Sequence, residues 1–81
     1  MTEVAKEIDV VRLLEPVEAT VIGERRTVII PKGSEGTVVV VEGPATKPEA
    51  YEVEFVLKAL ETYALATVPP DLVAVVWRAG G

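Results

Sequence analysis

The sequence predicts an all-β fold, on three observations. Five segments have the composition of short strands, and no apolar pattern of helical period runs for more than a few residues. Residues 37–41 are all β-branched, and such side chains fit a pleated strand but lose χ1 freedom in a helix. In residues 51–57 one side of the strand would carry Tyr51, Val53, Phe55 and Leu57 and the other Glu52 and Glu54, the period of a strand that has one dry face. We therefore expect a small barrel or sandwich of about five antiparallel strands.

Turn-forming residues separate most of the expected strands. The first strand ends at Glu15 and Pro16, because proline has no N–H to donate to a neighbouring strand. Residues 58–62 contain helix formers but lie between two strand patterns, so we interpret them as a turn. Asp71 and Leu72 predict a short 3₁₀ turn before the last strand. The five predicted strands are residues 9–14, 37–41, 51–57, 63–68 and 73–77.

Residues 17–26 leave two alternatives open, because polar and apolar side chains mix there around Gly23. The stretch fits the long first loop of a small barrel. It also fits a projecting hairpin whose second strand is residues 27–30. At the ends of the chain, residues 1–8 are expected to be a flexible arm too short for a stable helix, and residues 79–81 a loose tail. Residues 9–78 would then form one barrel domain.

The spacing Gly33-x-x-Gly36-x-Val38-x-x-Val41 resembles the glycine-hinged KOW motif of small SH3-like barrels. Glycine adopts positive φ without a Cβ clash, so we expect Gly33 and Gly36 to form a turn and a bulge that redirect the chain. With the segments 50–55 and 65–72 that follow in order, the motif resembles a family of short uncharacterised bacterial proteins, a domain of unknown function. The resemblance implies an SH3-like barrel and no activity.

The composition excludes several kinds of chemistry. Cysteine and histidine are absent, which removes disulfides, thiolate sites, the usual general base and the commonest metal ligand. Asparagine and glutamine are absent too, a depletion that predicts a thermophilic source. The net charge of −5 repels polyanions and opposes binding to nucleic acid or an anionic membrane. The first residues lack the features of a signal peptide, and no apolar run is long enough to span a membrane, so we expect a cytoplasmic protein.

The candidate catalytic residues have simpler structural interpretations. Ser34 lies between two glycines, as a nucleophile can, but without histidine only Lys32 could act as its base, so we interpret Ser34 as a turn residue. Glu52 and Glu54 share one face of a strand at a spacing of about 7 Å, which could suit a cation or an acid–base pair. A solvated acidic face that protects the strand is the favoured interpretation. We expect no catalytic residue, no metal site and no cofactor, and hence no enzyme.

Apolar residues exceed what one small core needs, because sixteen valines occur, many of them in runs. In the second predicted strand, Val38 and Val40 share one face, and Val39 and Val41 share the other. Trp77 ends the last strand at a position typical of a barrel rim, and tryptophan is enriched at binding hot spots. The excess predicts a surface covered by a partner.

The remaining aromatic and basic residues complete this prediction. Tyr51 and Phe55 share a face with other apolar residues and are expected in the core, whereas the sequence does not show whether Tyr63 is buried or exposed. Arg25 and Arg26 are adjacent in a loop and could clamp an anion or a partner's carboxylate. The predicted interface residues are Val39, Val41, Trp77, Arg25 and Arg26.

Two functions remain open. The first is a non-catalytic protein-interaction module, an accessory subunit or regulator that binds another protein or itself, with a homodimer as the simplest assembly. The second is a nucleic-acid-binding barrel of the KOW type. The motif favours the second and the charge opposes it, since phosphate neutralisation supplies most non-specific affinity. We therefore predict an interaction module that binds neither nucleic acid nor membrane.

Overall fold

The computed structural model describes residues 4–80, in which seven strands form one antiparallel sheet. The all-β prediction is confirmed, as is the 3₁₀ turn before the last strand, but there are seven strands and not five. A second 3₁₀ turn, η1, falls where a turn was expected. The elements are β1 (Val10–Leu13), β2 (Val17–Val21), β3 (Thr27–Ile30), β4 (Glu35–Glu42), β5 (Ala50–Leu57), η1 (Lys58–Leu60), β6 (Thr62–Val68), η2 (Pro70–Leu72) and β7 (Val73–Trp77).

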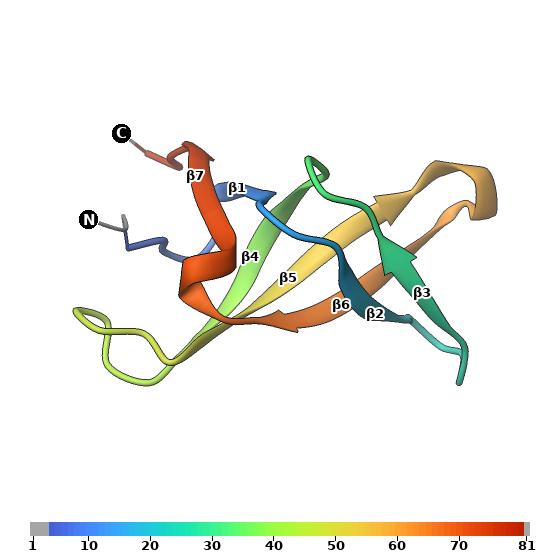
Figure 1. The fold of residues 1–81 in the computed structure, drawn as a ribbon, viewed down its shortest axis with the longest axis horizontal. Coiled ribbons are helices and arrows are strands. Elements are labelled where there is room, and N and C mark those ends of the chain that lie inside the picture. Colours follow the sequence, from blue (N-terminus) through green and yellow to red (C-terminus); the bar gives the residue numbers. More distant parts are fainter. Residues whose placement is uncertain (1–3, 81) are drawn as a thin grey trace.

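The sheet has the strand order β3-β2-β6-β5-β4-β1-β7 and curls around its own inner face (Figure 1). Strands β4, β5 and β6 form a meander, and β7 returns to pair with β1. These five strands are the predicted ones. The two additional strands, β2 and β3, form a hairpin that pairs with β6 through β2.

This hairpin resolves the two alternatives for residues 17–30. The loop interpretation is wrong, and the hairpin interpretation is correct. Ala19 and Val21 on β2 are buried, whereas Glu18 and Thr20, which alternate with them, are exposed. The alternation has the period of a strand whose inner face packs on the core.

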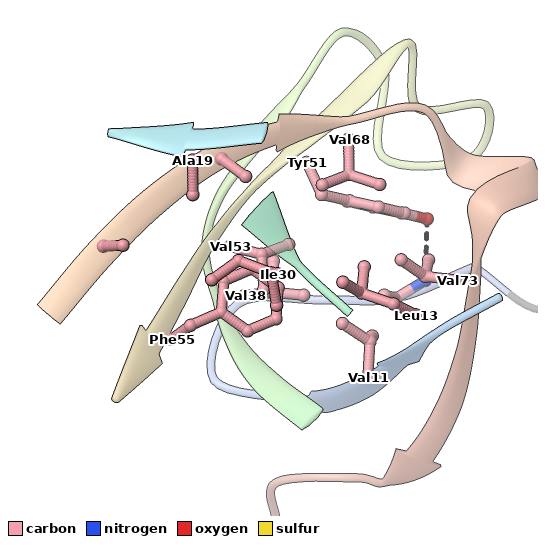
Figure 2. Packing of buried hydrophobic residues seen from close by; sticks show 13 residues of the cluster. Val11, Leu13, Ala19, Ile30, Val38, Tyr51, Val53, Phe55, Val68 and Val73 are labelled. Atoms are coloured by element: carbon pink, nitrogen blue, oxygen red, sulfur yellow. Dashed lines mark hydrogen bonds between the residues drawn. The ribbon is translucent and has the colours of Figure 1, made fainter. Parts of the chain in front are cut away.

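The core fills the concave side of the curled sheet (Figure 2). Tyr51, Val53 and Phe55 on β5 are buried, as their alternation with acidic residues predicts. Figure 2 shows side chains from several strands meeting inside the curve, with Val11 and Leu13 on β1 among them. Complete burial of a side chain such as valine or phenylalanine contributes about 1.5–3 kcal/mol, so this cluster supplies the main stabilising term.

The glycine hinge differs from the prediction at its second glycine. Gly33 has a φ of +88°, so it adopts the left-handed conformation of a turn. Gly36 is not in that region; it is buried within β4, facing the side chains of Val53 and Phe55. The bulge lies further along the strand, where Val39 is the extra residue between Val38 and Val40 in the pairing with β5.

The bulge also changes which valines of β4 face the core. Val38 is buried, and both Val39 and Val40 are exposed because the extra residue interrupts the alternation. Val41 then returns toward the inside and packs against the core. The expectation that Val40 shares a face with Val38 is therefore wrong, and so is the expectation that Val41 is part of the outer surface.

Candidate functional site

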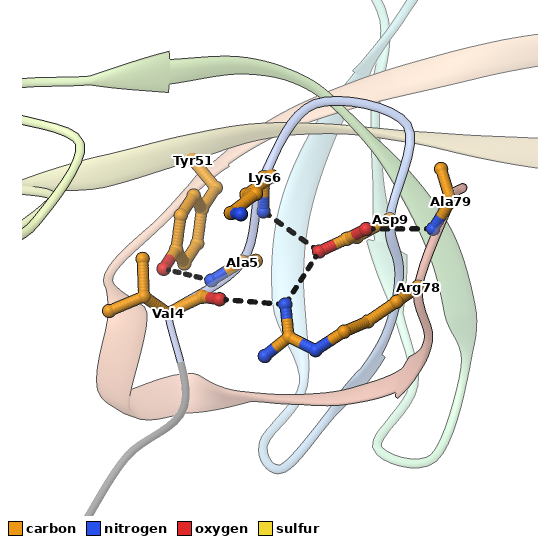
Figure 3. Close-up of polar contacts among 7 residues, drawn as sticks. All are labelled: Val4, Ala5, Lys6, Asp9, Tyr51, Arg78 and Ala79. Atoms are coloured by element: carbon orange, nitrogen blue, oxygen red, sulfur yellow. Dashed lines mark hydrogen bonds and ion pairs between the residues drawn. The ribbon is translucent and has the colours of Figure 1, made fainter. Parts of the chain in front are cut away.

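Asp9 is the one charged residue that is buried among residues 4–80, with 2% of its surface exposed. Both oxygens of its carboxylate accept hydrogen bonds (Figure 3). Oδ2 accepts from the backbone N–H of Lys6 at 2.9 Å and from the Arg78 guanidinium at 3.3 Å. Oδ1 accepts from the backbone N–H of Ala79 at 3.0 Å. A buried carboxylate needs such partners, because an unpaired buried charge is strongly destabilising.

Further contacts extend this cluster, which we call the terminal clasp: Val4, Ala5, Lys6, Asp9, Tyr51, Arg78 and Ala79. The Tyr51 hydroxyl accepts a hydrogen bond from the buried N–H of Ala5 at 2.9 Å, and Arg78 also donates to the Val4 carbonyl at 3.2 Å. Residues 4–8 and Ala79, expected in a flexible arm and a loose tail, are thus held against the sheet. Residues 1–3 and 81 lie outside the described part. The clasp joins the segment before β1 to the segment after β7 and to β5, and has a structural role.

The candidate catalytic residues lie in a turn and on the outer face of β5. Ser34 is part of the turn after β3, where its N–H donates to the Pro31 carbonyl at 3.2 Å. Glu52 and Glu54 are half-buried on the outer face of β5, and Glu52 accepts a hydrogen bond from the Thr67 hydroxyl at 2.7 Å. Within residues 4–80, no three histidine, cysteine, aspartate or glutamate side chains are arranged to hold a metal ion.

One carboxyl near these residues is perturbed. The pKa of Glu42 is raised above its usual value, first by a hydrogen bond with Glu52, then by partial loss of hydration and by the charges of Glu52 and Glu49. Glu42 is exposed, so solvent screens these charges. The hydrogen bond with Glu52 favours the protonated form of Glu42, and the neighbouring negative charges act in the same direction.

An apolar group on the outer face of β7, β1 and β4 includes two of the predicted interface residues. Val11 is buried, so the side chain of the preceding residue, Val10, points outward. Val10 pairs with Trp77 on β7, and 55% of the surface of Trp77 is exposed. The N–H of Ile8 donates to the Val38 carbonyl at 2.7 Å, which brings Ile8 next to the exposed Val39. We call this group, Ile8, Val10, Val39 and Trp77, the Trp77 face.

Ile8 has an unusual backbone within this group. Its φ is +74°, and a β-branched residue in the left-handed region costs of order 1–3 kcal/mol. The residue nevertheless leaves 63% of its surface exposed, so no burial of its own side chain offsets this strain. Strained residues that persist often belong to functional surfaces.

A second apolar row crosses the outer face of β5 and β6. Val56 on β5 pairs with Tyr63 on β6, and the N–H of Ile22 donates to the Tyr63 carbonyl at 2.9 Å. All three side chains are exposed. Sequence reasoning left Tyr63 undetermined and did not identify Val56, although Val56 follows Glu52 and Glu54 at the next outward position of the strand. We call these three residues the Tyr63 row.

The predicted interface residues therefore do not form one site. Val39 and Trp77 lie on neighbouring parts of the same outer face, whereas Val41 packs against the core. Arg25 and Arg26 are exposed in the turn between β2 and β3, at the opposite end of the strand order from β7. Arg26 forms an exposed ion pair with Glu24 at 3.3 Å.

Comparisons with known proteins identify no relative. No protein-family model, no curated protein sequence and no solved structure matches the chain. The resemblance to a family of uncharacterised bacterial proteins stays a prediction. In the part of the chain that the structure describes, no helix has the length and apolar character needed to cross a membrane.

Proposed function

We propose that this protein is a non-catalytic interaction module that associates with a second copy of itself through the Trp77 face. The observation that carries the proposal is the exposure of Trp77 beside Val10, together with the strained and exposed Ile8. Tryptophan is among the residues that most often dominate binding energy, and contiguous exposed apolar side chains mark contact surfaces.

The charges around this face favour a second copy as the occupant. A two-fold contact places the same surface on both sides, so the surface must be complementary to itself. The Trp77 face contains no charged side chain. Of its charged neighbours on the same strands, Arg12 and Glu35 form an ion pair at 3.0 Å and cancel each other, which leaves Glu42 at the far end of β4. Two such faces can meet with no like charges among the four residues that form them.

Nucleic-acid binding is the weaker candidate. The net charge of −5 opposes it, and Arg12, the basic residue of β1, is already paired with Glu35. The proposal also keeps the cytoplasmic location that the sequence predicts.

Replacing Trp77 with serine is expected to convert a dimer into a monomer in sedimentation equilibrium at tens of micromolar protein. Loss of a hot-spot tryptophan costs about 2 kcal/mol or more, which corresponds to roughly a thirtyfold weaker association. Because Trp77 is half exposed, the same change should leave the urea midpoint of the folded protein nearly unaltered.

Tyr63→Ser provides the matched control, since Tyr63 is an aromatic residue of similar exposure on the Tyr63 row. It should leave the dimer intact. A wild-type protein that is monomeric at this concentration would contradict the proposal, and so would equal weakening by the two substitutions.

A further inference from the structure

Among residues 4–80, strand β3 forms one end of the sheet, with β2 on one side and no strand on the other (Figure 1). The N–H of Val21 donates to the Arg26 carbonyl at 2.9 Å, and hydrogen-bonded pairs alternate along an antiparallel ladder. Val28 and Ile30 therefore bond to β2. The N–H and C=O groups of Thr27 and Ile29 point toward the open edge, where an added strand would find partners for them.

The side chains of this edge do little to block pairing. Natural edge strands are commonly protected by lysine, proline or an inward charge. Residues 27–30 contain none of these, and all four are β-branched. Ile29 is 65% exposed, the largest value among the large apolar side chains described. The edge thus offers both free backbone groups and an apolar side chain.

Basic side chains flank this edge in an otherwise acidic chain. Residues 24–32 contain three of the eight basic residues and one of the thirteen acidic ones. Arg25 and Arg26 precede the strand, and Lys32 follows it. Glu24 pairs with Arg26, and no residue within the described range forms an ion pair with Arg25 or Lys32.

We propose that the edge of β3 binds an extended segment of a different protein by strand addition, and that this segment carries apolar residues between acidic ones. The added backbone would pair with Thr27 and Ile29, while alternate side chains would contact Ile29. Acidic residues at the two ends of the segment would meet the basic residues that flank β3.

A second copy of this chain is disfavoured at this edge. Two β3 strands that pair about a two-fold axis bring together two copies of residues 24–32, each with three basic residues and one acidic residue. Both segments carry a net positive charge, so they repel each other. The inference rests on the proposed function, a module that binds proteins, but it concerns another surface and another partner than the Trp77 face.

The test uses a labelled peptide, Asp-Glu-Val-Thr-Val-Thr-Asp-Glu, and a matched peptide with lysine at the four acidic positions. We expect the acidic peptide to bind in fluorescence anisotropy and to shift the amide NMR signals of Thr27 and Ile29. The lysine peptide should bind about tenfold more weakly or worse, because opposite charges across a contact attract and like charges repel. Equal binding of the two peptides, no binding up to millimolar concentration, or shifts confined to another surface would each overturn the proposal.

Two variants of the protein complete the test. Ile29→Pro removes a free N–H of the edge without removing a bond to β2, and proline is tolerated at such positions, so it should abolish peptide binding. If that variant does not fold, the double variant Arg25→Glu and Lys32→Glu is expected to reverse the preference toward the lysine peptide. Unchanged peptide binding by the variants would contradict the proposal. Displacement of the peptide by single-stranded RNA at a concentration lower than that of the peptide would also contradict it.

Trp77→Ser separates this proposal from self-association. The variant should bind the acidic peptide as the wild type does. Peptide binding by a protein that never dimerises would overturn only the role of the Trp77 face, and dimerisation without peptide binding would overturn only the role of β3.

Discussion

Replacing Gly36 with alanine is expected to lower the free energy of unfolding by about 2 kcal/mol, and replacing it with valine by about 3 kcal/mol, the range for overpacked cores. A Cβ at this position would lie 2.7 Å from Cγ1 of Val53 and 2.8 Å from two ring carbons of Phe55. Both neighbours are buried, so neither can move without disturbing the core. The sequence predicted a positive φ at Gly36, but the structure assigns the cost to steric contact.

Urea denaturation with a matched glycine variant can distinguish these causes. Gly33 has a φ of +88° and no atom within 4 Å of the position of an added Cβ. Gly33→Ala should therefore cost about 1 kcal/mol, from the backbone alone. Combining Gly36→Ala with Val53→Ala should destabilise the protein by less than the sum of the two changes, because the second relieves the closest contact. An unchanged urea midpoint for Gly36→Val would contradict the steric explanation.

Replacing Asp9 with asparagine is expected to lower the free energy of unfolding by about 3 kcal/mol, the cost of breaking a buried charged pair. The side chain keeps its shape, but its amide nitrogen cannot accept a hydrogen bond. One of the backbone donors, the N–H of Lys6 or of Ala79, then faces another donor. The guanidinium of Arg78 also loses the charge of its partner.

Glu35→Gln is the control for this second prediction. Glu35 and Arg12 form an ion pair of similar length, at 3.0 Å, but half of each side chain is exposed. Exposed pairs contribute less than about 1 kcal/mol, so the urea midpoint should hardly change. Equal shifts of the urea midpoint for Asp9→Asn and Glu35→Gln would show that the burial of Asp9 does not determine its contribution to stability.

The regular strands of this fold were predictable because their side chains alternate. β5 shows this best, with Tyr51, Val53 and Phe55 inside. β2 alternates as well, but its inward residues include the small Ala19, which is depleted in strands, so the pattern was weak. The run Val38 to Val41 has no alternation at all. Nothing in it shows where the extra residue of the bulge lies, and the faces of its valines could not be assigned.

The candidate surfaces were less predictable, because they depend on which strands become neighbours. Trp77 was identified from its residue type, but Ile8, which we assign to the same face, lies in a segment expected to be flexible. The burial and pairing of Asp9 could not be predicted either, since its partner Arg78 is 69 positions away in the sequence. The open edge of β3 follows from the strand order and could not be seen while residues 17–30 had no fixed register.

The terminal clasp also affects the order in which the protein folds. The meander of β4, β5 and β6 closes through short connections, whereas Asp9 and Ala79 meet across 70 positions. Closing a longer loop costs more entropy, so contacts of high sequence separation tend to form late. Interactions that are absent from the folding transition state act on the unfolding rate. We therefore expect the clasp to form late in folding and to slow unfolding more than it speeds folding.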